Sequence, residues 1–403
     1  MRLEAHDVLI VANPPPSFGG RYFILVKLVT ECGRTGWGEV YAASIGPEAM
    51  RAVIADVFQR HMAGENPEAV ERMFRRAYSA GFSQRPDPTV MGAFSGLEMA
   101  CWDLVGQARE RPIAALLGGQ LHARLRAYTY LYPNPDEDAA AFYASPARAG
   151  EAAAACVAEG WTAVKFDPAG PYTVFGGHQP LPEDLTRAAA LSMAVREAVG
   201  DGAELLFGTH GQFTPSGAVR MAHAIAPARP LWFEEPVPPD NAVAMASVAA
   251  ASPVPLAAGE RLTTRAEFWP LLQAGALGVC QPALGRVGGI WEARKLAALA
   301  ETAGASVAPH LYAGPVARAA SVQLAAALPN LLLVETVETP FHAALTGGAH
   351  PLRAGYITVT DAPGLGIEVD EALARASPWT GARLHLEMQD SAHVPGPNVW
   401  TGG

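Results

Sequence analysis

Short apolar segments alternate with longer segments of helical periodicity along most of the chain. The apolar segments have the length of strands, and the segments between them carry apolar residues at the spacing of a helix face. The expected strand–helix pairs are residues 125–131 and 146–159, 163–166 and 183–199, 204–207 and 216–225, 231–233 and 242–251, 256–258 and 265–273, 277–280 and 289–302, and 306–308 and 315–326, with a last strand at 331–334. Repeated units of this kind predict a parallel sheet with right-handed crossovers, in the number that closes a β/α barrel.

The pattern before this repeat is different. Alternating apolar residues predict three strands, and helical spacing with prolines near the helix starts predicts three helices. The strands are expected at residues 3–11, 22–29 and 37–41, the helices at 47–62, 67–78 and 91–110, and two flexible loops at 14–20 and 79–88. We therefore divide the chain into an α+β domain at residues 1–123, a barrel domain at 124–340, and a C-terminal tail at 341–403 that returns to the first domain.

Composition narrows the class of protein. The net charge is −10 and no basic block occurs, which argues against a nucleic-acid partner. No apolar run approaches the roughly 20 residues of a membrane span, and the first residues lack a signal-peptide core. The four cysteines have no CxxC spacing, which is typical of buried free thiols in a reducing compartment. We expect a cytoplasmic protein without a membrane or nucleic-acid partner.

Polar side chains stand where several expected strands end, at the edge where a barrel of this type places its active site. Glu234 and Glu260 end neighbouring strands. Carboxylate oxygens are hard ligands that suit Mg²⁺, so both residues are candidate metal ligands. The structural alternative is that each glutamate belongs to a salt bridge or lies at a helix N-terminus.

Two histidines occupy the same kind of position. His210 and His310 end strands that are four apart, so they are expected to face each other across the mouth of the barrel. Such a pair suits removal of a proton beside a carboxylate together with departure of a β-hydroxyl group. The alternative for each is a core histidine with satisfied hydrogen bonds.

Three further residues complete the candidate set. Lys165 and Asp167 are two apart at one strand end and share a face, so both are expected to point into the mouth. A buried lysine needs a partner, and Asp167, Glu234 or a substrate carboxylate could supply one. Glu335 ends the last strand and could accept hydrogen bonds from sugar hydroxyls. The alternative for these residues is an internal ion pair.

Several motifs resemble those of one known family. They are SGLEMACWDLVG at residues 95–106, WFEEP at 232–236, GER at 259–261 and GRVGGI at 285–290. In these stretches the chain resembles the enolase superfamily, in its mandelate racemase/muconate lactonizing enzyme-like branch. The resemblance implies an α/β fold, in which an α+β capping domain covers a modified (β/α)7β TIM barrel and is completed by the C-terminal tail. It also implies that a proton is taken from the carbon beside a carboxylate while Mg²⁺ stabilises the enediolate, an arrangement known for this superfamily.

The subgroup that the chain resembles most is the sugar-acid dehydratases of galactonate or mannonate type. The resemblance makes His210 the acid, His310 the base, and Glu234 and Glu260 two of the metal ligands. Two positions depart from it. Gly208 stands where the first metal-ligand Asp is expected, which weakens Mg²⁺ binding. Ala283 stands where an Asp orients the base.

Three outcomes of these departures are considered. His210, Asp167 or water could fill the ligand gap, the proton chemistry could be reassigned to Lys165, or the ancestral chemistry could be lost. The leading hypothesis is Mg²⁺-dependent dehydration of a sugar acid, an aldonate or aldarate, to a 2-keto-3-deoxy acid, with His310 or Lys165 as base. Alternatives are a racemase, epimerase or cycloisomerase, and an inactive barrel that binds a sugar acid or a partner. We also expect a homo-oligomer, with the loops at 14–20 and 79–88 closing over the site.

Overall fold

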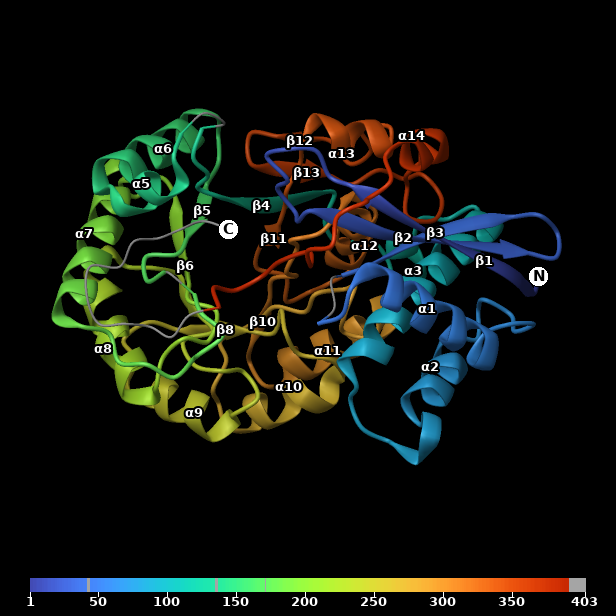
Figure 1. The fold of residues 1–403 in the computed structure, drawn as a ribbon, viewed down its shortest axis with the longest axis horizontal. Coiled ribbons are helices and arrows are strands. Elements are labelled where there is room, and N and C mark those ends of the chain that lie inside the picture. The colour runs from blue at the N-terminus through green and yellow to red at the C-terminus, as the bar shows by residue number, and fades with distance from the viewer. Residues whose placement is uncertain (42–43, 135–136, 171, 391–403) are drawn as a thin grey trace.

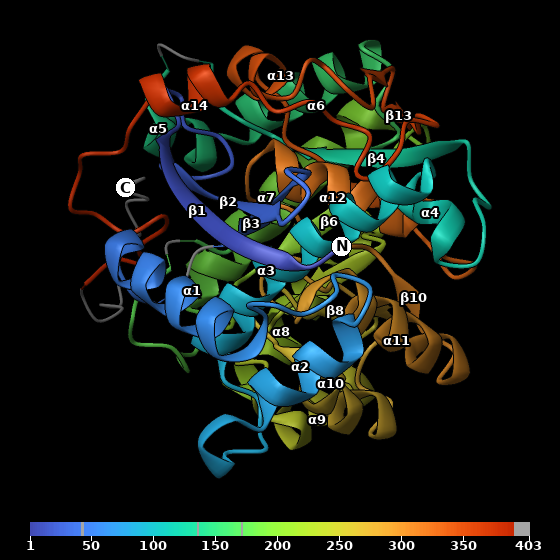
Figure 2. The same ribbon diagram turned by 90° about the vertical axis from the view of Figure 1, so that its right-hand side faces the viewer.

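A three-stranded antiparallel sheet opens the chain in the computed structural model, which describes residues 1–41, 44–134, 137–170 and 172–390. Helices cover one face of this sheet (Figure 2). The strands are β1 (Leu3–Ala12), β2 (Tyr22–Thr30) and β3 (Thr35–Val40), and the helices are α1 (Pro47–His61), α2 (Val70–Tyr78), α3 (Pro88–Arg109) and the short α4 (Ile113–Leu116). Apolar side chains from both layers, among them Ile24, Val26, Ile54 and Phe94, form one buried cluster.

Strands and helices then alternate, with the helices outside the strands (Figure 1). The strands are β4 (Arg124–Tyr130), β5 (Ala163–Phe166), β6 (Glu204–Gly208), β7 (Trp232–Glu234), β8 (Leu256–Ala258), β9 (Val279–Cys280), β10 (Ser306–Val307) and β11 (Val334–Glu335). The helices are α5 (Ala139–Ala144), α6 (Pro146–Ala158), α7 (Pro182–Val199), α8 (Pro215–Ile225), α9 (Ala242–Ala251), α10 (Thr264–Gln273), α11 (Gly289–Thr302) and α12 (Pro315–Ala326). The helices expected at residues 242–251, 289–302 and 315–326 are confirmed.

These strands form a mixed sheet in which parallel neighbours follow the chain order from β4 to β10. β11 pairs with the other side of β4, and a parallel bridge joins Val307 of β10 to Leu331, just before β11. The two ends of the strand series are therefore linked. The apolar side chains that the strands enclose form a cluster of their own: Tyr128, Ala163, Leu206, Trp232, Ala257, Val279, Ala308 and Leu333.

The C-terminal tail contacts both parts of the chain. It contains α13 (Pro340–Leu345), β12 (Leu352–Arg353), β13 (Tyr356–Thr358) and α14 (Glu371–Ala376). β13 pairs antiparallel with β4, whereas the backbone of Ser377 and Trp379 bonds to β1. Beyond α14 the chain crosses the strand region (Figure 1), and its last residues, 391–403, lie outside the described part.

Two buried glutamates of the first domain cap helices of the second. Glu39 of β3 accepts from the amides of Gly314 (2.6 Å) and Ala317 (2.9 Å) at the start of α12. Glu98 of α3 accepts from the amides of Ile290 (2.7 Å) and Trp291 (2.9 Å) at the start of α11. Unpaired amides at a helix N-terminus bind anions well, so these contacts fix the first domain against the strand–helix repeat.

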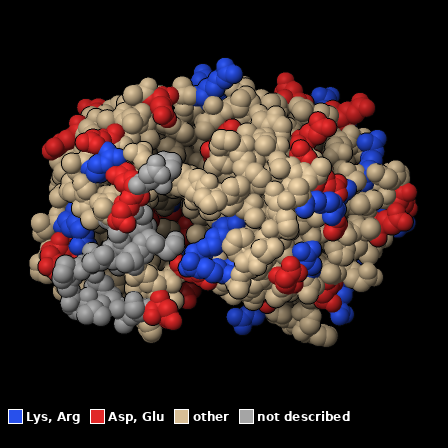
Figure 3. Space-filling view, turned by 45° about the horizontal axis from the view of Figure 1, so that its top comes forward, with Lys and Arg blue, Asp and Glu red and all other residues tan. Residues whose placement is uncertain are grey.

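The surface shown in Figure 3 carries acidic and basic side chains that are interspersed, without a large patch of one sign. A recess lies near the middle of this face, with basic side chains at its edge. Across the described ranges, no helix combines the length and the apolar character that a membrane crossing requires.

The buried caps make stability depend on pH. Burial raises the pKa of Glu98 to about 7, against the opposing effect of its amide donors. Between about pH 4.5 and 7 the folded protein holds a proton that the unfolded chain has released, so this group's contribution to stability falls as pH rises, by up to about 3 kcal/mol. Urea unfolding at pH 5 and 8 should show the wild type losing stability relative to Glu98→Gln as pH rises.

Glu48→Gln serves as the control of opposite sign. Glu48 is an exposed residue of α1, and the hydrogen bond from Arg51 lowers its pKa. The wild type should therefore gain stability relative to Glu48→Gln as pH rises from acid values. A wild type that gains stability over Glu98→Gln between pH 5 and 8 would contradict the assignment of Glu98.

Candidate active site

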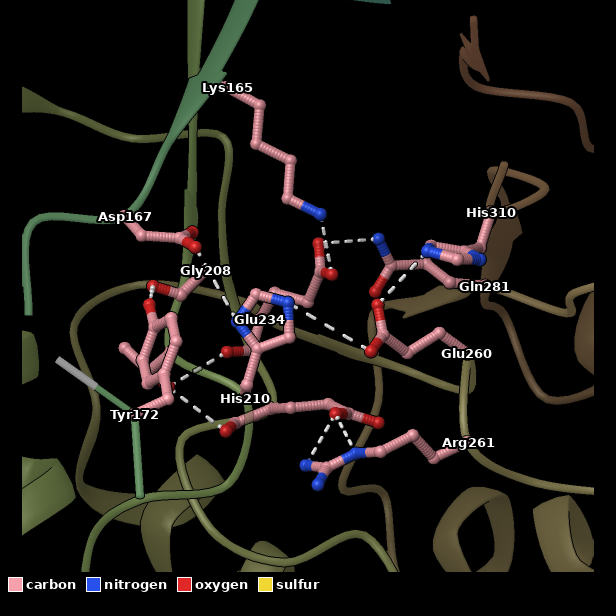
Figure 4. Close-up of polar contacts among 12 residues, drawn as sticks. Lys165, Asp167, Tyr172, Gly208, His210, Glu234, Glu260, Arg261, Gln281 and His310 are labelled. Carbon is pink, nitrogen blue, oxygen red and sulfur yellow. Dashed lines mark hydrogen bonds and ion pairs between the residues drawn. The ribbon is translucent and has the colours of Figure 1, made fainter. Parts of the chain in front are cut away.

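The site is the layer directly above the apolar cluster that the strands enclose. Side chains two residues apart in a strand share a face, so each residue of the cluster predicts a second inward-facing position two residues later. These positions are Tyr130, Lys165, Gly208, Glu234, Gly259, Gln281, His310 and Glu335. The polar residues of the layer come from six different strand ends, and Figure 4 shows Lys165, Glu234, Gln281 and His310 converging.

The carboxylate of Glu234 is held by three donors. Lys165 Nζ lies 2.6 Å from Oε1, and the side chains of both residues are about 98% buried or more, with exposures of 1% and 2%. Gln281 Nε2 donates to Oε2 at 2.7 Å, and Trp232 Nε1 donates to the same oxygen at 3.1 Å. Burial alone would lower the pKa of Lys165, but the carboxylates of Glu234 and Glu335 outweigh it and raise that pKa above its usual value.

Asp167 occupies the space that a side chain at position 208 would take. A Cβ placed on Gly208 would lie 2.3 Å from Asp167 Oδ1. The two residues end adjacent parallel strands, since Phe166 pairs with Phe207. Asp167 Oδ2 lies 3.5 Å from His210 Nδ1, and Tyr130 donates to Oδ1 at 3.5 Å. Asp167, one of the substitutes named for the missing Asp, thus has its carboxylate directly beside Gly208.

Glu260 lies between the two histidines. His310 Nε2 is 3.1 Å from Oε2, and His210 Nε2 is 3.9 Å from Oε1. Burial would raise the pKa of Glu260, but His310, His210 and Lys165 together outweigh burial and hold that pKa below its usual value. The His210 side chain is 25% exposed, whereas that of His310 is 4% exposed. The histidines expected to face each other thus meet across one carboxylate.

Ala283 leaves Nδ1 of His310 without a carboxylate partner at this position. The backbones of Ala283 and His310 form a parallel bridge, so the two residues are neighbours. Nδ1 of His310 is buried and has no hydrogen-bond partner among the described residues. A small cavity of about 10 Å³ lies here, lined by both residues and by Tyr41. The carboxylate that would orient this ring is absent, and Glu260 positions it through Nε2 instead.

Glu335 lies deep in the same group of charges. It accepts from the Leu311 amide at 2.7 Å and lies 3.9 Å from Lys165 Nζ and 3.8 Å from His310 Nε2. Burial raises its pKa, although its interactions with Lys165 and His310 act in the opposite direction. The structure therefore brings all the predicted residues into one charged cluster, with Lys165, Glu234 and Glu335 beneath and His210 and Asp167 nearer to solvent.

Backbone strain accompanies these positions. His210 has φ 48° and Glu235 has φ 41°, in the left-handed region that non-glycine residues rarely adopt. Glu235 is fully buried and pairs with Arg261 at 2.6 Å, so the second carboxylate after β7 has a structural role. Strained residues persist only where their surroundings hold them, which here turns the His210 ring over the strand ends.

Other segments contribute residues that the sequence did not indicate. The Tyr41 ring lies 5.4 Å from that of His310, and the ring of Tyr172 lies 4.6 Å from that of His210. The C-terminal segment passes over both sides: His385 is buried against Tyr41, and Gln389 pairs through its backbone with Tyr172. Gln281 was not among the predicted site residues, although its position two residues after Val279 could have identified it.

The two loops that were expected to cover the site behave differently. In the loop at residues 14–20, Phe18 stacks on Tyr132 at 3.8 Å, just beyond the end of β4. The loop at 79–88 projects from the surface beyond α2 in both ribbon views, and Phe82 is 99% exposed. It does not cover the strand ends, and the C-terminal segment with Tyr41 does so in its place.

Family models match most of the chain. The model for the mandelate racemase/muconate lactonizing enzyme N-terminal domain matches residues 11–118, and the enolase C-terminal domain-like model matches residues 148–373. The chain belongs to the mandelate racemase/muconate lactonizing enzyme branch of the enolase superfamily. It has that superfamily's fold, an N-terminal capping domain and a C-terminal barrel.

Individual relatives agree with this assignment. The chain is 32% identical to D-galactarolactone cycloisomerase of Agrobacterium fabrum over 88% of this chain and 90% of the relative. It is 30% identical to D-galactonate dehydratase of Ralstonia nicotianae over 87% and 90%. The solved structure of a mandelate racemase/muconate lactonizing enzyme-like protein from Roseovarius sp. TM1035 has 61% identity and a TM-score of 0.96, covering 97% of this chain and 99% of that one.

Members of the superfamily typically use Mg²⁺, but the side chains of this site do not fit it. Both oxygens of Glu234 already accept hydrogen bonds, and one of those bonds comes from an ammonium group. The His210 ring separates Asp167 from Glu260. Among the described residues no group of three or more His, Cys, Asp or Glu side chains is arranged to hold a metal ion. The predicted Mg²⁺ site at Glu234 and Glu260 is not supported by this arrangement.

The shared space of Asp167 and Gly208 can be tested by a double-mutant cycle. Gly208→Ala should displace the Asp167 carboxylate and destabilise the protein by about 1–3 kcal/mol, as overpacking does. In an Asp167→Ala background the same substitution should cost little, because the clashing oxygen is gone. Free energies of unfolding from urea titrations measure the coupling. Additive effects would show that Asp167 does not fill this space.

Proposed function

We propose that this chain is a hydro-lyase that dehydrates a sugar acid, an aldonate or aldarate, to a 2-keto-3-deoxy acid. The observation that carries the proposal is the pair of imidazoles on either side of Glu260, one buried and one partly exposed. Dehydration needs a base at the α-carbon and an acid at the β-oxygen, and two histidines on different strands can serve both. Relatives named galactonate dehydratase support this substrate class.

The proposed elimination of water needs two proton transfers, and a tautomerisation follows it. His310 takes the proton from the carbon beside the substrate carboxylate, and the electron pair moves into the carboxylate to give an enediolate. The C–O bond at the β-carbon then breaks as the electron pair returns, and His210 gives a proton to the departing hydroxyl, which leaves as water. The resulting enol then tautomerises to the 2-keto acid, as its C2 hydroxyl loses a proton and the β-carbon gains one.

In this scheme Lys165 carries a positive charge and does not act as the base. A general base must be unprotonated when it acts, and the carboxylates around Lys165 raise its pKa. Asp167 is proposed to orient His210 and to contact the substrate, since it lies beside that ring and is 15% exposed. Glu335 is proposed to accept from a substrate hydroxyl at the base of the site.

We also propose a division of the chain into three parts. Residues 1–123 form the capping domain, 124–340 a modified (β/α)7β barrel, and 341–403 a tail, in which the segment around His385 helps to close the site. Closure excludes water from an enediolate and strengthens the charge interactions around it.

A second candidate is isomerisation without water loss, as in a cycloisomerase or racemase. The relative named D-galactarolactone cycloisomerase favours it, because removal of the α-proton is common to both reactions. The two candidates differ in the fate of the β-oxygen. A third reading, an inactive barrel that binds a sugar acid, rests on Gly208 and Ala283.

The test is a panel of aldonic and aldaric acids assayed for 2-keto-3-deoxy products and for exchange of the α-proton in deuterium oxide. His310→Asn should lose both product and exchange by about 10²–10⁴-fold, because the base is removed. His210→Asn should keep exchange and lose product. His223→Asn, on the exposed face of α8, is the matched control and should match the wild type.

The possible outcomes separate the three candidates. Exchange without water loss for every acid would replace dehydration by racemisation or cycloisomerisation. A wild type that neither exchanges nor dehydrates any acid, while still binding one of them, would identify an inactive barrel.

A further inference from the structure

The cluster of carboxylates at the strand ends already contains a cation. Two of these carboxylates lie close to one ammonium group: Lys165 Nζ is 2.6 Å from Glu234 and 3.9 Å from Glu335. The Lys165 side chain is 1% exposed. A charge this deeply buried must be neutralised by its neighbours, so the group is as integral to the cluster as a bound ion would be.

The residues around the ammonium are arranged for it. Gln281 and Trp232 donate to the far oxygen of Glu234, so they direct the near oxygen towards Lys165. Gly208 leaves room for Asp167, because a Cβ there would lie 2.3 Å from Asp167 Oδ1 but only in ordinary contact, at 3.4 Å, with Lys165 Cε. The absence of a side chain at 208 therefore lets the Asp167 carboxylate lie beside the lysine stem.

We infer that this chain uses the ammonium group of Lys165 in the place of a divalent cation, and that its site binds no Mg²⁺. The inference rests on the proposed function for the part that the charge plays: it would stabilise the negative charge that develops on the substrate carboxylate when His310 removes the α-proton. A fixed cation in a water-excluded site stabilises such charge without the need to assemble a metal shell.

Binding of Mn²⁺, followed by the electron paramagnetic resonance signal of free Mn²⁺, tests the inference without turnover. The wild type should show no saturable site up to ~1 mM Mn²⁺, the range of weak oxygen-ligand sites. Lys165→Met removes the internal cation and should raise affinity by about 10-fold or more, to give one site per chain that Mg²⁺ displaces. Lys27→Met is the matched control, because it also removes an ammonium from a glutamate, Glu371, and should bind no Mn²⁺.

Two results would overturn the inference. One is a saturable Mn²⁺ site in the wild type that is lost in Glu260→Gln. The other is a Lys165→Met chain with wild-type circular dichroism that binds no Mn²⁺. If Lys165→Met does not fold, the Mn²⁺ titration of the wild type alone tests the inference.

Activity provides a separate arm. If the acid panel yields turnover, the rate should stay within about twofold after treatment with a chelator, since no step needs a metal. A loss of rate that Mg²⁺ restores would overturn the inference and leave the proposed dehydration standing. An inactive wild type that also binds no Mn²⁺ would refute dehydration and leave the ammonium site standing.

Discussion

The buried ion pair between Lys165 and Glu234 is the interaction on which the rest of the site depends. Its two groups are 2.6 Å apart and almost fully shielded from water. Removing two charges from water costs several kcal/mol for each, and their attraction offsets this only if the remaining donors and acceptors are also satisfied. Gln281 and Trp232 donate hydrogen bonds to Glu234, while Glu335 and Glu260 also interact electrostatically with the lysine. The two histidines lie on either side of Glu260.

The same principle holds the two domains together. Glu39 and Glu98 are buried carboxylates that bind amides at the starts of α12 and α11. Close approach of β3 to α3 supports this contact, because a Cβ on Gly38 would lie 1.9 Å from the Gly96 carbonyl oxygen. The capping domain is thereby fixed where Tyr41 reaches His310. Buried carboxyl groups with satisfied partners thus position both the site residues and the segment that covers them.

Much of this arrangement could be predicted from sequence, because the spacing of residues along helices and along strands determines it. Helical spacing located α9, α11 and α12, and the rule that strand residues two apart share a face places Lys165, Glu234 and His310 in one layer. The family motifs predicted the superfamily, and the family models confirm it. These features depend on local spacing, which the sequence displays directly.

The remaining features depend on contacts between distant segments. The position of the Asp167 carboxylate beside Gly208 follows from strand packing, and the passage of His385 over the mouth follows from the path of the tail. The loop at 79–88 has the composition of a mobile cover but lies beyond α2, away from the strand ends. Sequence spacing left Asp167, Glu234 and a substrate carboxylate open as partners of Lys165, and the side-chain contact identifies Glu234, the carboxylate expected to bind a metal.

The most direct test of this account is the coupling energy between Lys165 and Glu234, from the free energies of unfolding of Lys165→Met, Glu234→Gln and the double variant. We predict that each single variant loses about 3–5 kcal/mol, because it leaves a buried charge unpaired, and that the double variant loses less than the sum by at least about 2 kcal/mol. Additive losses, within about 0.5 kcal/mol, would contradict the account.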